Sequence, residues 1–463
     1  MMTHHSYIAA RALAGARLRT LARAALGAAL LAAVGACDTD RILRVEDPGA
    51  VRPEDINSPA ALPAVLAAAV GDFAVAYTGS GDEEGQVLTS GLLADEWRNS
   101  DTFGTRIEVD RRDIRDNNAT IQDVFRQMQR ARSTAERAAE AFGRLDPNSA
   151  GQAESLNLAG FSYILFAENY CSAVPFSSID PATSEFRYGA PLTTAQMLDT
   201  ALARFDAALA AATAAESPEQ VNLASVGRGR ALLNMGRFAE AAAAVAAVAA
   251  VPSDFTYLVE HSENTSRQWN GVWEYNQNEG RWSVADQEGG NGLPYISSGD
   301  PRTESMDTEE TGFDGVTPLF TQQRYPERES DAVLASGAEA RLIEAEAALQ
   351  AGGGATFLTA LNAARASAGA LPALTAASVP AAREGQVDLL FRERAFTLWL
   401  TSHRLGDMRR LVRQYGRATE SVFPTGTYPK GGSYGADVSF PVPVDERNNP
   451  EFSGIQSCDN TQP

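Results

Sequence analysis

The chain has 463 residues, 44% of them hydrophobic, and a formal charge of −20. A chain this acidic repels nucleic acid and anionic lipid headgroups, so we exclude both as recognition targets. Lys430 is the only lysine among 39 basic residues. Phosphate-binding loops and lysine-based catalysis are therefore excluded everywhere except at that position.

An export signal is predicted at residues 1–36. Four arginines precede eleven uncharged, mostly apolar residues at 24–34, which are too few to span a bilayer as a helix. Gly35 and Ala36 then lead directly into Cys37, as in bacterial lipoprotein signals. We predict cleavage before Cys37 and lipid attachment to its thiol; the alternative is an ordinary secretory signal with a chance cysteine. The mature chain loses four arginines and no acidic residue, so its formal charge is −24.

Helical periodicity dominates after a polar tether over residues 38–59. Apolar side chains recur at helical spacing at 62–77, 121–142 and 153–170. Thr193 with Gln196 three residues later is a capping-box pattern that begins a fourth helix. No segment after the signal contains eighteen uncharged apolar residues in a row, so lipid is the only membrane attachment expected.

Residues 224–251 match the tetratricopeptide pattern of two short antiparallel helices. Gly236 supplies the turn between them, Phe238 follows it, and Pro252 ends the second helix. The predicted fold class is therefore mainly α, a tetratricopeptide-like scaffold of about four helical hairpins with one large, irregular, loop-rich insertion. The other hairpins are expected at 153–209, at 338–366 and from Gln386 onward, and the insertion at about 253–335.

A charged pattern near the C-terminus predicts a structural stripe of ion pairs. Glu393 and Arg404 are eleven residues apart, three turns of a single helix, and Asp407 and Arg410 follow at intervals of three. On one helix Glu393 and Asp407 would lie about 21 Å apart, too far to flank a scissile bond. We therefore interpret these residues as structural and not as a catalytic pair.

Several motifs occur in an order typical of one family. Asp47-Pro48 follows the lipid-attachment signal, the turn at 166–176 contains Val174-Pro175, and hairpin repeats fill the middle of the chain. Near the end stand LLFRERAF at 389–396, HRLGDMRRL at 403–411, FPVP at 440–443 and then Asn449-Pro450. Over residues 37–463 this sequence resembles the SusD/RagB family, although Tyr170-Cys171-Ser172 replaces the usual Gly-Asp of the turn.

The resemblance implies a single SusD-like domain over residues 37–463 and a nutrient-binding lipoprotein of the outer membrane that faces the cell exterior. Such a protein caps a SusC-like TonB-dependent transporter and feeds it a glycan, or a peptide in the RagB branch. The alternative hypothesis is a tetratricopeptide-type surface adaptor that binds another protein and no small ligand. Neither hypothesis requires enzymatic activity or a cofactor, and none is predicted.

Candidate ligand-binding residues come from the placement of aromatic side chains. Three of the five tryptophans lie within fourteen residues of the insertion, interleaved with amide and charged residues. Aromatic faces stack on sugar rings, while amides, arginines and carboxylates bind hydroxyl groups. The alternative is that these tryptophans fill a small core beneath a long loop. The candidates are Trp269, Trp273, Tyr275, Arg281 and Trp282 in the insertion, and Trp97 and Asn99 before it.

Two cysteines remain in the mature chain, Cys171 and Cys458. In an oxidising compartment they form either a disulfide or two free thiols, and the sequence leaves both open. With no Cys-X-X-Cys pair and few histidines, no metal site is predicted, and a structural Ca²⁺ is left open.

The anchoring hypothesis predicts that Cys37→Ser releases the protein from the membrane fraction or leaves an uncleaved precursor, because serine cannot receive the lipid. Fractionation and electrophoretic mobility measure both outcomes. Membrane retention with the mobility of the wild-type protein would contradict lipid attachment at Cys37.

Overall fold

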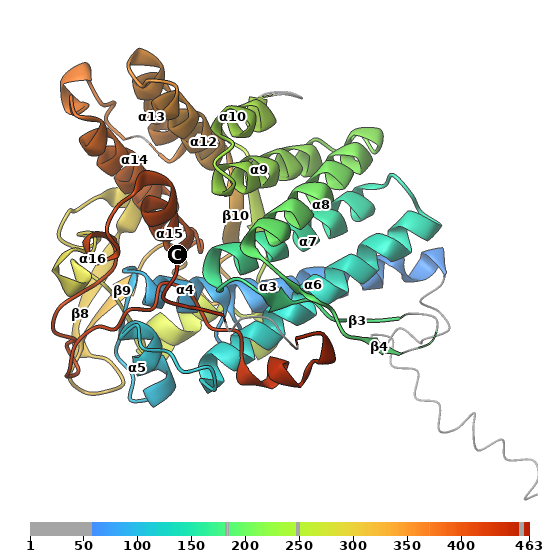
Figure 1. Ribbon diagram of the computed structural model, residues 1–463, viewed down its shortest axis with the longest axis horizontal. Helices are drawn as coiled ribbons and strands as arrows, with labels where there is room; N and C mark the ends of the chain where they lie inside the picture. The colour runs from blue at the N-terminus through green and yellow to red at the C-terminus, as the bar shows by residue number, and fades with distance from the viewer. Residues whose placement is uncertain (1–57, 181–182, 184, 247–250, 370, 453–457) are drawn as a thin grey trace, which may run out of the picture. The chain divides into compact units, whose positions relative to one another are not determined.

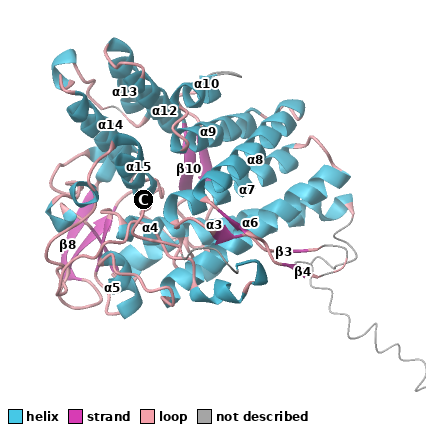
Figure 2. Ribbon diagram, in the orientation of Figure 1, coloured by secondary structure: helices cyan, strands magenta, loops and turns pink. Residues whose placement is uncertain are grey.

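The computed structural model describes residues 58–180, 183, 185–246, 251–369, 371–452 and 458–463. Cys37 and the Asp47-Pro48 pair lie outside the described residues. Helices are the main regular structure and the strands are short (Figure 2). The helices are α3 (Leu62–Thr78), α4 (Gln86–Leu93), α5 (Gly104–Asp110), α6 (Ala119–Leu145), α7 (Ala150–Asn169), α8 (Thr194–Ala214), α9 (Pro218–Asn234), α10 (Phe238–Ala246), α11 (Gly271–Trp273), α12 (Gly337–Gln350), α13 (Ala355–Ser367), α14 (Arg383–Thr397), α15 (Arg404–Tyr415) and α16 (Thr419–Val422).

The helices pack in a series that follows the sequence. α3 packs against α6, α6 against α7, α7 against α8, and α8 against α9. α9 then contacts α10, α10 contacts α12, and α12 contacts both α13 and α14. In Figure 1 α6, α7, α8 and α9 lie side by side, and α12, α13 and α14 continue from them. The predicted mainly α fold of tetratricopeptide-like helical hairpins is confirmed.

Glycines allow the helices of this series to approach closely. The ring of Phe205 on α8 lies against Gly160 of α7 and Gly227 of α9, and a Cβ atom at Gly160 or Gly227 would lie within 2.7 Å or 2.3 Å of that ring. The ring of Phe161 meets that of Phe205 edge-on at 5.1 Å. Any larger residue at either glycine would push the helices apart, which is why the repeats place small residues there.

The predicted helix boundaries also follow from local chemistry. Thr193 and Gln196 form the expected capping box at the start of α8. Gly236, between α9 and α10, has a φ of 74°, a backbone conformation that glycine adopts without strain.

Short antiparallel strand pairs organise the insertion at 253–335. Its two ends pair as β6 and β10, so the chain leaves the helical scaffold and returns to it at one place. Within the insertion β8 pairs with β9, and β7 pairs with β1, which precedes the insertion in the sequence. The strands are β1 (Trp97–Asn99), β2 (Val174–Pro175), β3 (Ser178–Ile179), β4 (Phe186–Arg187), β5 (Pro191–Leu192), β6 (Thr256–Val259), β7 (Trp282–Val284), β8 (Ser305–Thr311), β9 (Pro318–Gln322) and β10 (Ala332–Ser336).

One helix among the described residues, Pro59–Thr78, is long and apolar enough by length and composition to cross a membrane. Half of that segment is buried inside the protein. Its Asp72 forms ion pairs with Arg130, at 3.0 Å, and with Arg267, at 2.6 Å. These contacts identify it as a helix of the core.

A buried turn at residues 398–403 separates α14 from α15. Leu400 and Ser402 in this turn have φ values of 55° and 57°, so the helix cannot continue through it. α14 packs on α12 and α13, whereas α15 packs on α4 and α7. The prediction that Glu393 and Arg404 lie three turns apart on one helix is therefore wrong. The helical propensity of these residues favours one continuous helix, but hydrogen bonds from distant side chains stabilise the turn instead.

Those hydrogen bonds come from side chains far away in the sequence. The Leu400 N–H donates to Glu96 Oε1 at 3.0 Å, and the Leu400 carbonyl accepts from the Tyr325 hydroxyl at 3.1 Å. The Thr401 carbonyl accepts from the Tyr77 hydroxyl at 3.0 Å, and the Ser402 carbonyl accepts from Arg230 at 3.3 Å.

His403, the last residue of the turn, and Arg404, which follows it, continue this network. His403 Nε2 lies 3.0 Å from Glu339 Oε1. The guanidinium of Arg404 donates two hydrogen bonds to the carboxylate of Asp95, at 2.6 and 2.7 Å. The buried turn therefore joins elements that lie more than 300 residues apart in the sequence.

The four residues of the predicted stripe are engaged separately. Asp407 and Arg410 form the expected pair at 3.0 Å within α15. Each residue of the stripe also meets a partner elsewhere in the fold, so all four act structurally. These partners are Arg302 and Arg365 for Glu393, Asp95 for Arg404, Arg394 for Asp407, and Glu346 for Arg410.

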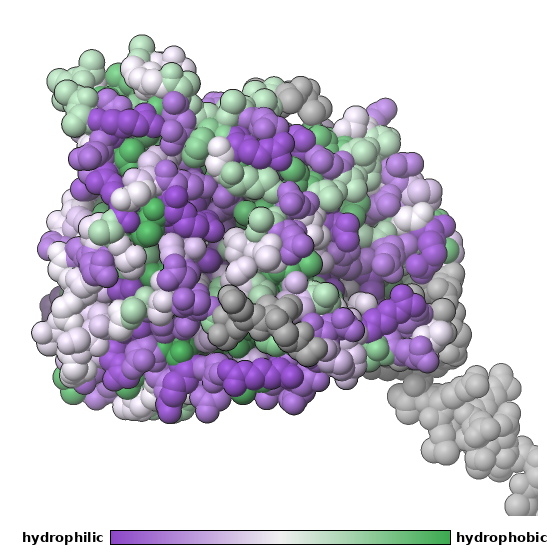
Figure 3. All heavy atoms as spheres, viewed as in Figure 1, coloured by the Kyte–Doolittle hydropathy of each residue, from purple (hydrophilic) through white to green (hydrophobic). Residues whose placement is uncertain are grey.

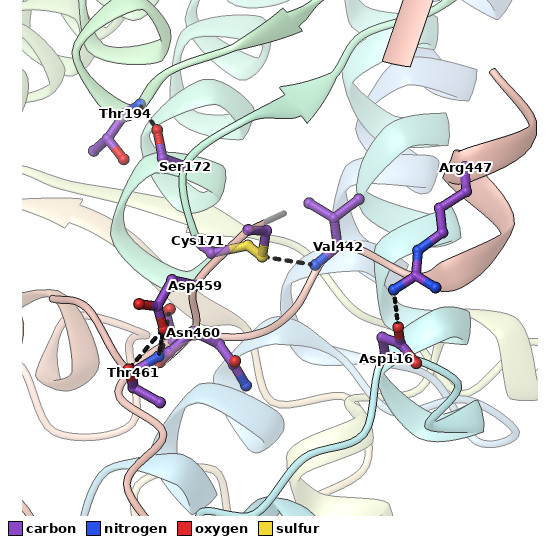
Figure 4. Close-up of a disulfide and its surroundings, with 11 residues drawn as sticks. Asp116, Cys171, Ser172, Thr194, Val442, Arg447, Asp459, Asn460 and Thr461 are labelled. Atoms are coloured by element: carbon purple, nitrogen blue, oxygen red, sulfur yellow. Dashed lines mark hydrogen bonds and ion pairs between the residues drawn. A yellow bond between two sulfur atoms is a disulfide. The ribbon is translucent and has the colours of Figure 1, made fainter. Parts of the chain in front are cut away.

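A disulfide joins Cys171 and Cys458, whose Cα atoms are 5.5 Å apart (Figure 4). The segment around Phe440 runs between the two cysteines. The Phe440 N–H donates to the Asn169 carbonyl at 2.7 Å, and the Val438 N–H donates to the Asn460 carbonyl at 2.8 Å. The disulfide thus fastens the C-terminal residues over the segment that contains the FPVP motif.

Removal of this disulfide should lower the free energy of unfolding by about 2–5 kcal/mol, since the crosslink closes a loop of more than 280 residues. Cys171→Ser and Cys458→Ser should lower the melting temperature equally, and a reductant should do the same to the wild-type protein. Peptide mapping without reduction should recover the two cysteine peptides joined. Free alkylation of both thiols in the native protein would contradict the pairing.

Burial raises the pKa of Glu96 to about 8, because the fully buried carboxyl loses its hydration. Between about pH 4.5 and 8 the folded protein therefore keeps Glu96 protonated. In the unfolded chain the same carboxyl has its ordinary pKa of 4.5 and has already lost the proton. Stability contributed by this group should fall as pH rises from about 4.5 to 8, by on the order of 2–4 kcal/mol in total. Denaturant unfolding at pH 5 and pH 8.5 should show this fall in the wild-type protein and a smaller one in Glu96→Gln. Glu140→Gln, at an exposed position of α6, is the control. Identical pH profiles for Glu96→Gln and wild type would contradict the assignment.

Candidate functional site

Asn270 fixes the local structure of the candidate site. Its side-chain oxygen accepts from the Val272 N–H at 2.9 Å and so caps α11. Its backbone N–H donates to the Arg328 carbonyl and its side-chain amide to the Ser330 carbonyl, both at 2.7 Å. These bonds bring the segment of Arg328 beside Trp269, which precedes α11, and Trp273, the last residue of α11.

Trp269 and Trp273 enclose the guanidinium group of Arg328. Its central carbon lies 4.6 Å from the ring centre of Trp269 and 5.1 Å from that of Trp273. All three side chains are partly exposed. Within the described ranges the guanidinium has no hydrogen-bond or ion-pair partner. We call these three residues the tryptophan–arginine stack. It offers aromatic surface and unused N–H donors in one place.

A groove of about 680 Å³ adjoins this stack through Gln268, the residue before Trp269. One wall is a face of α3 made of small and apolar residues, and the rest is mostly polar. Hydroxyl, amide and arginine groups there are suited to the hydroxyl groups of a polar ligand. The groove is lined by Ala67, Ala68, Val70, Gly71, Asp72, Ala74, Arg130, Glu260, His261, Ser262, Asn264, Thr265, Arg267 and Gln268.

Burial reduces the charge of two titratable groups in this region. It raises the pKa of Glu274, the residue after Trp273, and it lowers the pKa of His261 in the groove. Both shifts favour the uncharged form of the side chain. Asp72 is shared by Arg130 and Arg267, so the charges within the groove are largely paired. This arrangement suits a neutral polar ligand.

The predictions for Trp97 and Trp282 as ligand contacts are wrong. Both side chains are fully buried, because β1 and β7 pair with Trp97 opposite Val284 and Asn99 opposite Trp282. Strand pairing directs both indoles into the core, which is the alternative that the sequence left open.

The remaining candidates, Asn99, Tyr275 and Arg281, lie around Asp101 and its neighbour Arg106. Asn99 and Tyr275 are buried, so the prediction that they contact ligand is also wrong, whereas Arg281 is partly exposed. The Asp101 N–H donates to Asn99 Oδ1 at 3.0 Å, and Arg281 donates to Asp101 Oδ1 at 3.1 Å. Arg106, a third neighbour of Asp101, lies over the ring of Tyr275 at 5.2 Å. The structure therefore divides the sequence candidates between two clusters.

Sequence reasoning missed three residues of these clusters. Arg328 lies in a run of charged residues that resembles ordinary solvated surface, so no signal marked it. The rings of Phe103 and Phe313 lie against the guanidinium of Arg281, with centres 5.1 and 3.8 Å from its central carbon. Each is next to a glycine at the end of a regular element, Gly104 at the start of α5 and Gly312 after β8, and that pattern is a usable signal.

Of the residues described, no group of three or more histidine, cysteine or acidic side chains could hold a metal ion. The carboxylates of Glu393 and Asp407 both bind arginines.

Residues 260–449 match the model of the SusD family. Solved structures share the fold over nearly their whole length. A SusD superfamily protein of Parabacteroides distasonis has a TM-score of 0.62 at 13% identity, with 86% of this chain and 99% of that one covered. A SusD-like carbohydrate-binding protein of Bacteroides fragilis has a TM-score of 0.59 at 14% identity, with 86% and 99% covered. Surface glycan-binding protein A of Bacteroides thetaiotaomicron, in complex with laminarihexaose, has a TM-score of 0.60 at 11% identity, with 87% and 100% covered.

Comparison with curated proteins gives no match. The helical-hairpin fold of this chain is also the fold of these SusD-like structures. The family match includes the buried turn, α15 and the FPVP segment. Residues 260–449 of this chain thus match the SusD family, and the chain has the fold of SusD-like solved structures.

Proposed function

We propose that this chain is a glycan-binding lipoprotein of the cell surface. A single SusD-like domain over residues 37–463, anchored through Cys37 and facing the cell exterior, presents its ligand to a SusC-like TonB-dependent transporter of the outer membrane. The observation that carries the proposal is the tryptophan–arginine stack beside a polar groove of about 680 Å³. Indole faces bind the apolar faces of sugar rings, and the unused donors of Arg328 are available for hydroxyl oxygens.

Similar proteins support this reading. One solved relative is a SusD-like carbohydrate-binding protein, and another holds laminarihexaose. The charges inside the groove also support it, since Arg130 and Arg267 share Asp72 and are not free to bind an anion. A neutral glycan is therefore the first ligand class to test, and a peptide is the competing class.

A second surface favours contact with a protein partner. Ile179, Phe186 and Tyr188 on the β3–β4 hairpin are each about half exposed, and they line a groove of about 530 Å³. Exposed apolar side chains around a groove are typical of protein docking sites. The remainder of the surface visible in Figure 3 is a mosaic of hydrophilic and hydrophobic residues. The groove beside the β3–β4 hairpin would serve either as the contact with the transporter or as the binding surface of the adaptor hypothesis.

Binding measurements on tryptophan variants test the glycan proposal. Trp269→Ala and Trp273→Ala should each weaken glycan binding by about thirty-fold, on the order of 2 kcal/mol, with little change in melting temperature. Trp282→Ala is the matched control, because loss of a buried tryptophan should cost about 3–5 kcal/mol of folding stability. Glycan arrays and peptide pools, read by thermal shift, first identify the bound member.

Normal binding by well-folded Trp269→Ala and Trp273→Ala proteins would exclude the tryptophan–arginine stack as the site. Binding of peptides in place of glycans would assign the ligand to the competing class. Retention of a protein partner with no small ligand bound would favour the adaptor hypothesis.

A further inference from the structure

Phe103 and Phe313 lie at the exposed end of a second stack, in which aromatic rings alternate with guanidinium groups. The guanidinium carbon of Arg281 is 3.8 Å from the ring centre of Phe313 and 5.1 Å from that of Phe103. The guanidinium carbon of Arg106 is 4.8 Å from Phe103 and 5.2 Å from Tyr275. Tyr275 is buried, whereas Phe103 and Phe313 are each 51% exposed. The stack therefore holds two phenyl rings open to solvent.

The charges within this second stack are paired. Asp101 bridges the two arginines, with Oδ2 bound to Arg106 and Oδ1 lying 3.1 Å from Arg281. Burial of Asp101 opposes its ionisation, but the hydrogen bond and charge of Arg106 outweigh this and lower its pKa. Glu84 pairs with Arg106 and Glu279 with Arg281. Three carboxylates thus face two arginines, so neither guanidinium is left as a free positive charge for an anionic ligand.

Backbone bonds hold the two phenylalanine loops together. The Phe313 N–H donates to the Gly280 carbonyl and the Asp314 N–H to the Ser100 carbonyl, both at 2.9 Å. A Cβ atom at Gly312 would lie 2.4 Å from that of Ser100, so the close approach requires a glycine there. The two rings are therefore preorganised.

Lys430 fastens the same two loops from a third segment. Its ammonium group lies 2.7 Å from Asn99 Oδ1, 2.6 Å from the Asp101 carbonyl and 2.8 Å from Asp314 Oδ2. Three acceptors match the three protons of an ammonium group, whereas a planar guanidinium cannot meet three converging acceptors in this way. This geometry explains why position 430 has a lysine in a chain whose other basic residues are arginines.

We propose that Phe103 and Phe313 form a second sugar-binding face, for neutral sugar units of a bound glycan, and that Lys430 is the residue that positions them. The inference rests on the proposed function, since both sites would engage the same class of ligand. Flat apolar rings with paired charges around them favour a neutral sugar unit over an ionic one. A protein partner at these exposed rings is the competing occupant and an outcome of the test.

The test uses the purified mature protein and the neutral hexasaccharide laminarihexaose, together with array members of neutral and acidic oligosaccharides. Phe103→Ala and Phe313→Ala should weaken binding of the bound neutral member about tenfold, with melting temperatures close to that of the wild type. Lys430→Met should weaken it to a similar degree and accelerate hydrogen exchange at 99–104 and 312–317, which the phenylalanine variants should leave protected. Lys430→Arg should rescue binding only in part. Arg237→Met, which removes an exposed arginine of a surface pair, is the control.

If Lys430→Met fails to fold, Asp314→Asn removes one of its three acceptors and takes its place. Glycan binding that survives unchanged in both phenylalanine variants, while Trp269→Ala abolishes it, would overturn this inference and leave the proposed function intact. Binding of no oligosaccharide by the wild-type protein would overturn both. Loss of a protein partner from the phenylalanine variants, with glycan binding unchanged, would assign the face to protein docking.

Discussion

The buried turn at 398–403 is the constraint on which the rest of the structure depends. Its backbone leaves the helical path, so its N–H and carbonyl groups cannot bond within a helix. A buried backbone group without a partner costs about 1–3 kcal/mol, which makes each outside partner necessary. Glu96, Tyr77, Arg230 and Tyr325 provide those partners from four distant parts of the chain. The turn can therefore form only when the helical scaffold and the insertion are both in place.

The proposed ligand-binding face is linked to this turn through a short stretch of chain. Glu96 holds Leu400, and the next residues along the chain form β1, which pairs with β7 of the insertion. β1 ends at Asn99, which accepts from Lys430, and the loop beyond it includes Phe103. The scaffold and the exposed aromatic rings are thus coupled through about eight residues. Recognition can be carried by loops because their ends are fixed in the core.

Sequence reasoning succeeded where local chemistry decides the structure. Gly236 and the Thr193–Gln196 capping box act through neighbouring residues, and both occur as predicted. It failed at the break between α14 and α15, because the deciding bonds come from residues such as Glu96 that no local pattern reveals. The sequence also provided no basis for predicting which tryptophans are buried. Trp97 and Trp273 both stand among polar residues in the sequence, yet strand pairing buries the first, and packing leaves the second partly exposed against Arg328.

The distribution of arginine in this acidic protein fits the neutral ligand that we propose for it. Many arginines are used inside the fold, where Arg394, Arg404 and Arg410 bind carboxylates in the core. A planar guanidinium can make several hydrogen bonds at once, so it satisfies buried carboxylates that a lysine would leave partly unpaired. At both aromatic clusters arginine has another use, since its flat face packs against indole or phenyl rings and fixes their orientation. The arginines thus hold the aromatic rings in place, and the exposed parts of those rings remain free for the proposed ligand.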